Sequence, residues 1–163
     1  FAASAKGIEY GVIADIAGEL IEANRGRTFQ YTRDLVRDLK QKGYFLLAVS
    51  YSPKFMVDGL AYELGFDKSY GVFYDIGASS RFSGEIVDEH LIMNKGAILD
   101  RALKKNNLTL HGSLAIGTTE SDITLLDRTE ASLAFNPSRV LYRHAKQKRW
   151  ELVVEHKNVI YEM

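Results

Sequence analysis

The 163-residue sequence contains no cysteine, no net charge and no long hydrophobic run. Without cysteine the chain can form no disulfide, carries no thiolate nucleophile and cannot hold zinc through sulfur. No apolar run reaches the roughly 18 residues that a membrane-spanning helix needs. Lysine and arginine total 21, as do aspartate and glutamate, so no overall field attracts nucleic acid or an anionic membrane. We therefore expect neither of these among its partners.

The remaining composition is that of an ordinary globular protein, with 46% hydrophobic and 26% charged residues. The length suits one domain with a sizeable core. No signal peptide is recognisable, so we expect a cytoplasmic location. The chain begins with Phe1 rather than methionine, which we interpret as a processed, trimmed or partial chain. The oligomeric state is unknown at this stage.

Helical and strand-like patterns alternate along the chain, which predicts an α/β fold: a Rossmann-like parallel sheet with helices on both faces. Asn94 is expected to cap one helix, while Ser52–Pro53 and Asn136–Pro137 are expected to begin two others. Gly43 is placed to end a helix. Helices are expected over residues 8–21, 27–42, 53–64, 94–103 and 136–145, a hairpin over 69–88, and strands over 44–49, 113–117, 132–135, 150–154 and 158–163.

Two of the expected strands end in small polar residues, and each is followed by the start of a helix. Ser50 follows the run 44–49, and Thr118 follows the run 113–117. Ligands bind at the carboxyl ends of the strands in an open parallel sheet, where helix N-termini can hold an anion. We interpret Ser52 as a helix cap only. For Ser50, capping and phosphate binding are equally open.

Lys95 directly follows the predicted cap Asn94, so it places a cation at the positive end of a helix. Such a placement costs up to about 1 kcal/mol. A local rule that is broken without visible compensation often marks a functional residue. The alternative is a lysine that lies exposed to solvent.

In order and spacing, these segments resemble the haloacid dehalogenase superfamily of phosphohydrolases, in particular its phosphoserine phosphatase-like branch, subfamily IB. The resemblance implies that Ser50 binds the substrate phosphate and that Lys95 neutralises charge in the transition state. It also places Asp122 and Thr118 at positions that hold Mg²⁺. The matching segments are "YTRDLVRDLKQKGYFLLAVSYSPKFMVDGLAYELGFDKSYG", "RFSGEIVDEHLIMNKGAILDRAL" and "AIGTTESDITLLDRTEASLAFNPSRVLYRHAKQKRWELV".

The sequence departs from this family pattern at two places. The fourth motif of the family reads Gly-Asp-x-x-x-Asp, and here Gly117 and Asp122 match while Thr118 replaces the first acid. A hydroxyl is a poorer ligand than a carboxylate for a hard cation, and Glu120 is an alternative ligand. The first motif, Asp-x-Asp, has no match, because no two aspartates are two positions apart. Its first aspartate is the family's nucleophile, so we expect this chain to be inactive as printed.

The closest imitation of that motif is "VIADIAGEL", in which Asp15 would be the nucleophile. The helical periodicity of residues 8–21 argues against this, because the motif needs a buried strand that ends at the aspartate. The resemblance instead suggests that residues 1–28 are the remnant of a helical cap. Residues 29–163 would then form the α/β core, without the N-terminal strand that carries the first motif.

The resemblance therefore implies a Mg²⁺-dependent hydrolase of a small phosphorylated metabolite, acting through an aspartyl-phosphate, with its nucleophile absent from this chain. The alternative is a non-catalytic relative that binds a phosphorylated ligand or a protein partner, and Thr118 is its main support. A flavodoxin-like domain explains the sheet but not Lys95. The basic run 143–149 is interpreted as a solvated helix face. The histidines have no ligand spacing and are taken as surface or structural residues: His90, His111, His144 and His156.

Overall fold

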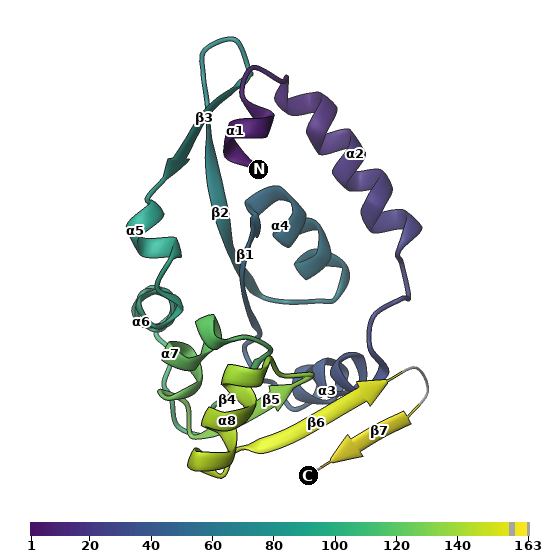
Figure 1. Cartoon of the computed structure of the whole chain (residues 1–163), viewed down its shortest axis with the longest axis vertical. Helices are drawn as coiled ribbons and strands as arrows, with labels where there is room; N and C mark the ends of the chain where they lie inside the picture. The colour runs from purple at the N-terminus through teal and green to yellow at the C-terminus, as the bar shows by residue number, and fades with distance from the viewer. Residues whose placement is uncertain (157–158, 163) are drawn as a thin grey trace. The chain divides into compact units, whose positions relative to one another are not determined.

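A computed structural model describes residues 1–156 and 159–162, and the side chains of residues 90, 91, 159 and 160 lie outside this description. The chain forms two compact units, Phe1–Met93 and Asn94–Met163 (Figure 1). Helices alternate with strands in both units, which confirms the predicted α/β class. The predicted boundary between residues 28 and 29 lies inside the first unit and stays a prediction. In the described part of the chain, no helix has the length and apolarity to cross a membrane.

The N-terminal unit builds a three-stranded sheet of order β1-β2-β3. Strands β1 and β2 are parallel, while β2 and β3 form the predicted antiparallel hairpin. Helix α4 packs on this sheet, and α2 packs on α4. The elements are α1 (Ala2–Ala5), α2 (Tyr10–Ala23), α3 (Gln30–Gln41), β1 (Leu47–Pro53), α4 (Lys54–Glu63), β2 (Lys68–Ile76), β3 (Phe82–Val87) and α5 (Glu89–Ile92).

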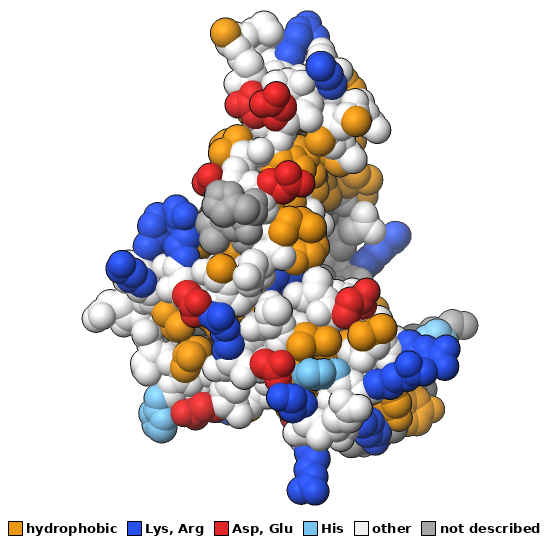
Figure 2. Space-filling view, turned by 60° about the vertical axis from the view of Figure 1, so that its left-hand side comes forward, with side chains coloured by type: hydrophobic (Ala, Val, Ile, Leu, Met, Phe, Trp, Pro, Cys, Tyr) orange, Lys and Arg blue, Asp and Glu red, His pale blue; other side chains and the backbone are white. Residues whose placement is uncertain are grey.

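Helix α2 packs on one face and leaves a second apolar row exposed. Ala17 is buried, and Ile21 approaches α4 at Gly59, where an added Cβ would lie 2.6 Å from Ile21 Cδ1. Val12, Ile16 and Leu20, one turn apart, are each about half exposed; hydrophobic side chains are visible at the surface of this unit in Figure 2. The helix is therefore apolar on two sides.

Asp15 lies in the middle of α2 and is exposed. To act as the nucleophile of the first motif, Asp15 would have to lie at the end of a buried strand. The structure contradicts that reading, because the recurrence of apolar residues every three to four positions folds residues 10–23 as a helix.

The C-terminal unit contains a four-stranded sheet of order β4-β5-β6-β7. Strands β4, β5 and β6 are parallel, and β7 pairs antiparallel with β6. Asn158 and Met163, the ends of the last predicted strand, lie outside the described residues. The elements are α6 (Lys95–Asn106), β4 (Leu114–Gly117), the 3₁₀ helix η1 (Glu120–Asp122), α7 (Ile123–Leu126), β5 (Ala131–Phe135), α8 (Arg139–Lys148), β6 (Glu151–His156) and β7 (Val159–Glu162).

The core of this unit is formed by helices α7 and α8 against the parallel strands. Leu126 of α7 and Leu141 of α8 are completely buried, and they pack with small residues of the strands, such as Ala115 and Ala134. Full burial of a leucine side chain stabilises by about 1.5–3 kcal/mol. Because Leu126 follows η1 by only four residues, this packing anchors the loop between β4 and α7.

Two of the predicted helix starts are wrong, whereas the predicted cap Asn94 is confirmed. Ser52 and Pro53 belong to β1, and α4 begins at Lys54 without a side-chain cap. Helix α8 begins at Arg139, and Ser138 accepts the capping hydrogen bond. Asn136 instead adopts a positive φ of 41° and exchanges two hydrogen bonds with the backbone of β6. Short polar side chains compete in this way with helix initiation.

Candidate functional site

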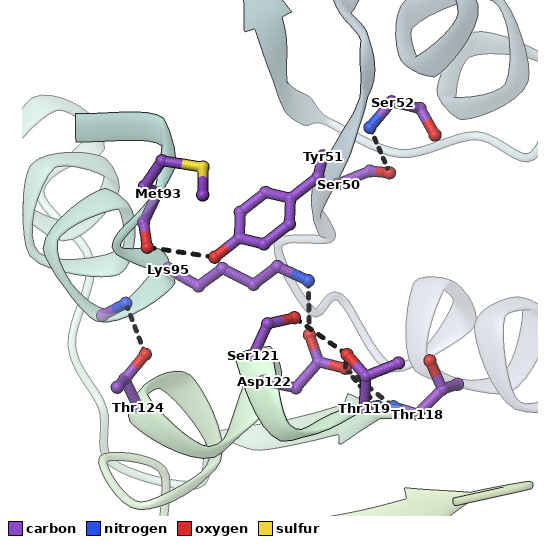
Figure 3. Close-up of polar contacts among 11 residues, drawn as sticks. Ser50, Tyr51, Ser52, Met93, Lys95, Thr118, Thr119, Ser121, Asp122 and Thr124 are labelled. Atoms are coloured by element: carbon purple, nitrogen blue, oxygen red, sulfur yellow. Dashed lines mark hydrogen bonds and ion pairs between the residues drawn. The ribbon is translucent and has the colours of Figure 1, made fainter. Parts of the chain in front are cut away.

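A buried ion pair joins Lys95 and Asp122 in the C-terminal unit (Figure 3). Lys95 is the first residue of α6 and Asp122 the last residue of η1, and each is only 8% exposed. The ammonium of Lys95 donates to Asp122 Oδ1. Since an unpaired charge at this depth is costly, Asp122 compensates for the position of Lys95 at the positive end of α6. The alternative of an exposed Lys95 is therefore wrong.

The second carboxylate oxygen of Asp122 closes the loop that follows β4. Asp122 Oδ2 accepts hydrogen bonds from the backbone N–H groups of Thr118, at 2.8 Å, and Thr119, at 2.9 Å. The hydroxyl groups of Thr119 and Ser121 lie 2.8 Å apart and share a hydrogen bond. One carboxylate thus orients both the loop backbone and the ammonium of Lys95.

The environment of Asp122 keeps it ionised. Burial alone would raise the pKa of this carboxyl group, but hydrogen bonds from Lys95 and from the backbone of Thr119 and Thr118 outweigh burial and lower the pKa below its usual value. Near neutral pH Asp122 is therefore a carboxylate.

Gly117 and Gly96 allow the backbone segments around this pair to approach closely. A Cβ on Gly117 would lie 2.5 Å from Asp122 Cβ and 2.9 Å from Leu126 Cδ1. A Cβ on Gly96 would lie 2.9 Å from the carbonyl oxygen of Thr124, and the Gly96 N–H donates to the Thr124 hydroxyl at 3.3 Å. Neither position has room for a side chain, which explains why the residue before Thr118 is a glycine.

Thr118 and Glu120 are held by the segment that precedes α8. The Ser138 N–H donates to the carbonyl oxygen of Thr118 at 2.7 Å, and the Ser138 hydroxyl donates to Glu120 Oε2 at 3.0 Å. Sequence reasoning missed Ser138, although a serine three residues before Leu141 is a recognisable helix cap.

By themselves these residues do not complete a Mg²⁺ site. Mg²⁺ requires near-octahedral coordination by oxygen, normally with carboxylates among the ligands. Thr118 offers a neutral hydroxyl, and both oxygens of Asp122 already accept hydrogen bonds. Within residues 1–156 and 159–162, no three histidine, aspartate or glutamate side chains are grouped so that they could hold a metal ion. Metal binding by Asp122 and Thr118 stays a prediction.

Ser50 belongs to the N-terminal unit, where it lies in β1. Its Oγ accepts the N–H of Ser52 at 3.1 Å, and the neighbouring Tyr51 hydroxyl donates to the carbonyl oxygen of Met93 at 3.0 Å. The structure thus brings Lys95, Thr118 and Asp122 together in one unit and places Ser50 in the other. Phosphate binding by Ser50 stays a prediction.

The N-terminal unit also contains a pocket of about 130 Å³ that no predicted site residue lines. Five aromatic rings, from α2, α4 and the hairpin, contribute to its wall, together with the ion pair of Lys54 and Asp58. Burial raises the pKa of one of these residues, Tyr74. Sequence reasoning missed the pocket because its residues are scattered along the chain. The rings belong to Tyr10, Phe55, Phe73, Tyr74 and Phe82.

Three of the four histidines can be placed. His111 is exposed beside Glu130, His144 lies beside Asp127 and Trp150, and His156 is exposed at the end of β6. The side chain of His90 lies outside the described residues. The lysine and arginine side chains of the run 143–149, from α8 and the residue after it, are exposed, as predicted.

The lowered pKa of Asp122 predicts a loss of stability in acid. The folded-state pKa lies below the unfolded value of about 3.9, so the stabilisation is fully present above that value and is lost as the pH falls through the folded-state pKa. We expect Asp122→Asn to lower the free energy of unfolding at pH 7 and to flatten its decline below about pH 4. Urea unfolding at a series of pH values measures both. Equal acid dependence in the two proteins would contradict this.

No family model matches the chain. It is 30% identical over 112 residues to a phosphoserine phosphatase of Archaeoglobus fulgidus, covering 67% of this chain and 32% of that protein. It is 24% identical over 115 residues to a phosphoserine phosphatase of Methanocaldococcus jannaschii, covering 69% and 53%. The chain thus spans about a third and about half the length of these relatives.

Solved structures confirm the fold. A Bordetella pertussis protein of unknown function superposes with a TM-score of 0.79 at 18% identity, covering 93% of this chain and 70% of that one. A probable phosphoserine phosphatase from Vibrio cholerae superposes with a TM-score of 0.68 at 15% identity, covering 87% and 42%. At these identities the likeness concerns the fold alone.

Proposed function

We propose that this chain, a phosphoserine phosphatase-like member of the haloacid dehalogenase superfamily, forms part of a phosphomonoester hydrolase. The buried pair of Lys95 and Asp122 carries the proposal. A desolvated, oriented ammonium stabilises developing negative charge more strongly than an exposed one, and it needs no reorganisation during the reaction. This is the requirement of phosphoryl transfer, in which the enzyme acts mainly through positioning and electrostatics.

Two residues have proposed roles in this reaction. The hydroxyl of Ser50 would donate a hydrogen bond to a phosphoryl oxygen, and its own Oγ is oriented by the N–H of Ser52. Lys95 would neutralise charge on the phosphoryl group in the transition state, while Asp122 holds its side chain in place. Neither role requires a metal ligand, which agrees with the incomplete Mg²⁺ site of the described residues.

The nucleophile is proposed to lie outside these 163 residues. An aspartyl-phosphate requires an attacking aspartate, and no pair of aspartates has the spacing of the first motif. The sheets are compatible with an additional strand: β1, which carries Ser50, and β4, which precedes Thr118, each lie at an edge of their sheet. Edge strands present backbone groups that can pair with another strand. This supports the proposed absence of the first core strand.

A small phosphorylated metabolite is the proposed substrate, because the relatives that match in sequence are phosphoserine phosphatases. The same relatives make the alternative, a non-catalytic module that binds a phosphorylated ligand or a protein, the less favoured function. A cytoplasmic location stays a prediction.

Phosphate release from phosphoserine tests the proposal. We expect release by the longest natural form of the protein that contains this sequence, and none by the 163 residues alone. Release by the 163 residues would contradict the absent nucleophile. No release by the longer form, from phosphoserine or from p-nitrophenyl phosphate, would contradict the hydrolase.

Ser50→Ala in the active form should weaken substrate binding. A hydrogen bond to a charged phosphoryl oxygen contributes about 1.5–3 kcal/mol, so the measured KM should rise roughly 10- to 150-fold. Ser52→Ala is the matched control, because it keeps the backbone N–H that orients Ser50 and should leave KM within about twofold. Equal KM values for the two variants would show that Ser50 does not bind the phosphate.

A further inference from the structure

We infer that the loop from Thr118 to Asp122 contributes no ligand to a metal ion, and that its carboxylate positions Lys95 instead. The cation of this site would then be the ammonium of Lys95. This inference concerns metal binding and does not depend on the proposed hydrolase activity.

The hydrogen bonds of Asp122 are the first support. Its oxygens accept four donors: the ammonium of Lys95 on Oδ1, and two backbone N–H groups and the Thr119 hydroxyl, at 3.4 Å, on Oδ2. A carboxylate offers about four lone-pair positions, so a metal ion would have to share or displace these donors. Sharing would place Mg²⁺ beside the Lys95 ammonium, within a buried region where like charges repel strongly. Displacement would leave that ammonium buried without its carboxylate, which is costly.

The other oxygen atoms of the loop are the second support. The carbonyl oxygen of Thr118 accepts the N–H of Ser138 at 2.7 Å, and Glu120 Oε2 accepts the hydroxyl of Ser138 at 3.0 Å. The side chain of Thr118 carries no charge. Lys95 and Asp122 together are neutral, so the one net negative charge of the loop is that of the exposed Glu120, whose Oε2 accepts the Ser138 hydroxyl.

This reasoning predicts that one added acid creates a metal site. Thr118→Asp adds a carboxylate at the exposed position directly after β4 and places one further negative charge beside Asp122. Mg²⁺ prefers carboxylate oxygen, so the variant should bind Mg²⁺ at least about tenfold more tightly than the native protein. Thr119→Asp is the matched control, because it adds the same charge one residue further along.

Calorimetric titration of the full chain with Mg²⁺, repeated with Mn²⁺ by electron paramagnetic resonance, tests the inference. We expect no saturable binding in the millimolar range for the native protein or for Thr119→Asp, and saturable binding for Thr118→Asp. Circular dichroism verifies that each variant is folded. Saturable binding by the native protein that Asp122→Asn abolishes would overturn the inference, as would equal affinity of the Thr118→Asp and native proteins.

Discussion

Lys95→Met is expected to lower the free energy of unfolding by about 3–5 kcal/mol, because it leaves the carboxylate of Asp122 buried without its ammonium partner. Both side chains are almost completely buried, so water cannot replace the lost partner. Urea unfolding at pH 7 measures the effect. Lys104→Met is the matched control, because Lys104 is an exposed lysine in the last turn of the same helix. This substitution should lower the free energy of unfolding by less than about 1 kcal/mol.

The cause of this destabilisation can be separated from a loss of packing. In the double variant Lys95→Met/Asp122→Asn no charge is left unpaired, so the loss should be smaller than the sum of the two single losses. The loss in Lys95→Met should also shrink as the pH falls through the pKa of Asp122, because a protonated carboxyl group leaves no unpaired charge. A loss below 1 kcal/mol in the single variant, or strict additivity in the double variant, would show that the pair is not coupled as the structure indicates.

The elements that could be predicted from the sequence are those whose signals are local. Helix α2 and the β2–β3 hairpin follow from periodicity and turn residues, and Asn94 caps α6 through its own side chain. The start of α4 could not be predicted in this way, because β1 continues to Pro53, which pairs with Val72 of β2 after a shift in register. Pairing with a strand some 20 residues away decides that boundary, and no local propensity reports it.

The candidate site likewise depends on contacts between residues that are far apart in the sequence. Lys95 was recognisable as a cation at the wrong end of a helix, but its burial depends on Asp122, 27 residues away. The hydrogen bonds of Ser138 to Thr118 and Glu120 likewise connect separate loops. The sequence therefore indicated which residues break local rules, whereas the compensating partners became visible only in the structure.

Gly117→Ala is expected to destabilise the protein by about 1–3 kcal/mol through steric overlap. The added methyl group would lie 2.5 Å from Asp122 Cβ and 2.9 Å from Leu126 Cδ1, and neither neighbour can move easily. Asp122 is held by three N–H donors, and Leu126 is completely buried in the core of the unit. Relief of the overlap would therefore shift the loop and weaken the pair of Lys95 and Asp122.

Gly18→Ala is the same substitution, but it is expected to stabilise the protein. Gly18 lies in α2, and no atom stands within 4 Å of its added Cβ. Alanine in an exposed helix interior is favoured over glycine by about 0.5–1 kcal/mol, so this variant should be more stable than the native protein. Urea unfolding measures the change in the free energy of unfolding, which should be a decrease for Gly117→Ala and an increase for Gly18→Ala. If Gly117→Ala were as stable as Gly18→Ala, the close approach of β4 to Asp122 would not exist in solution, and the positioning of Lys95 by this loop would lose its structural basis.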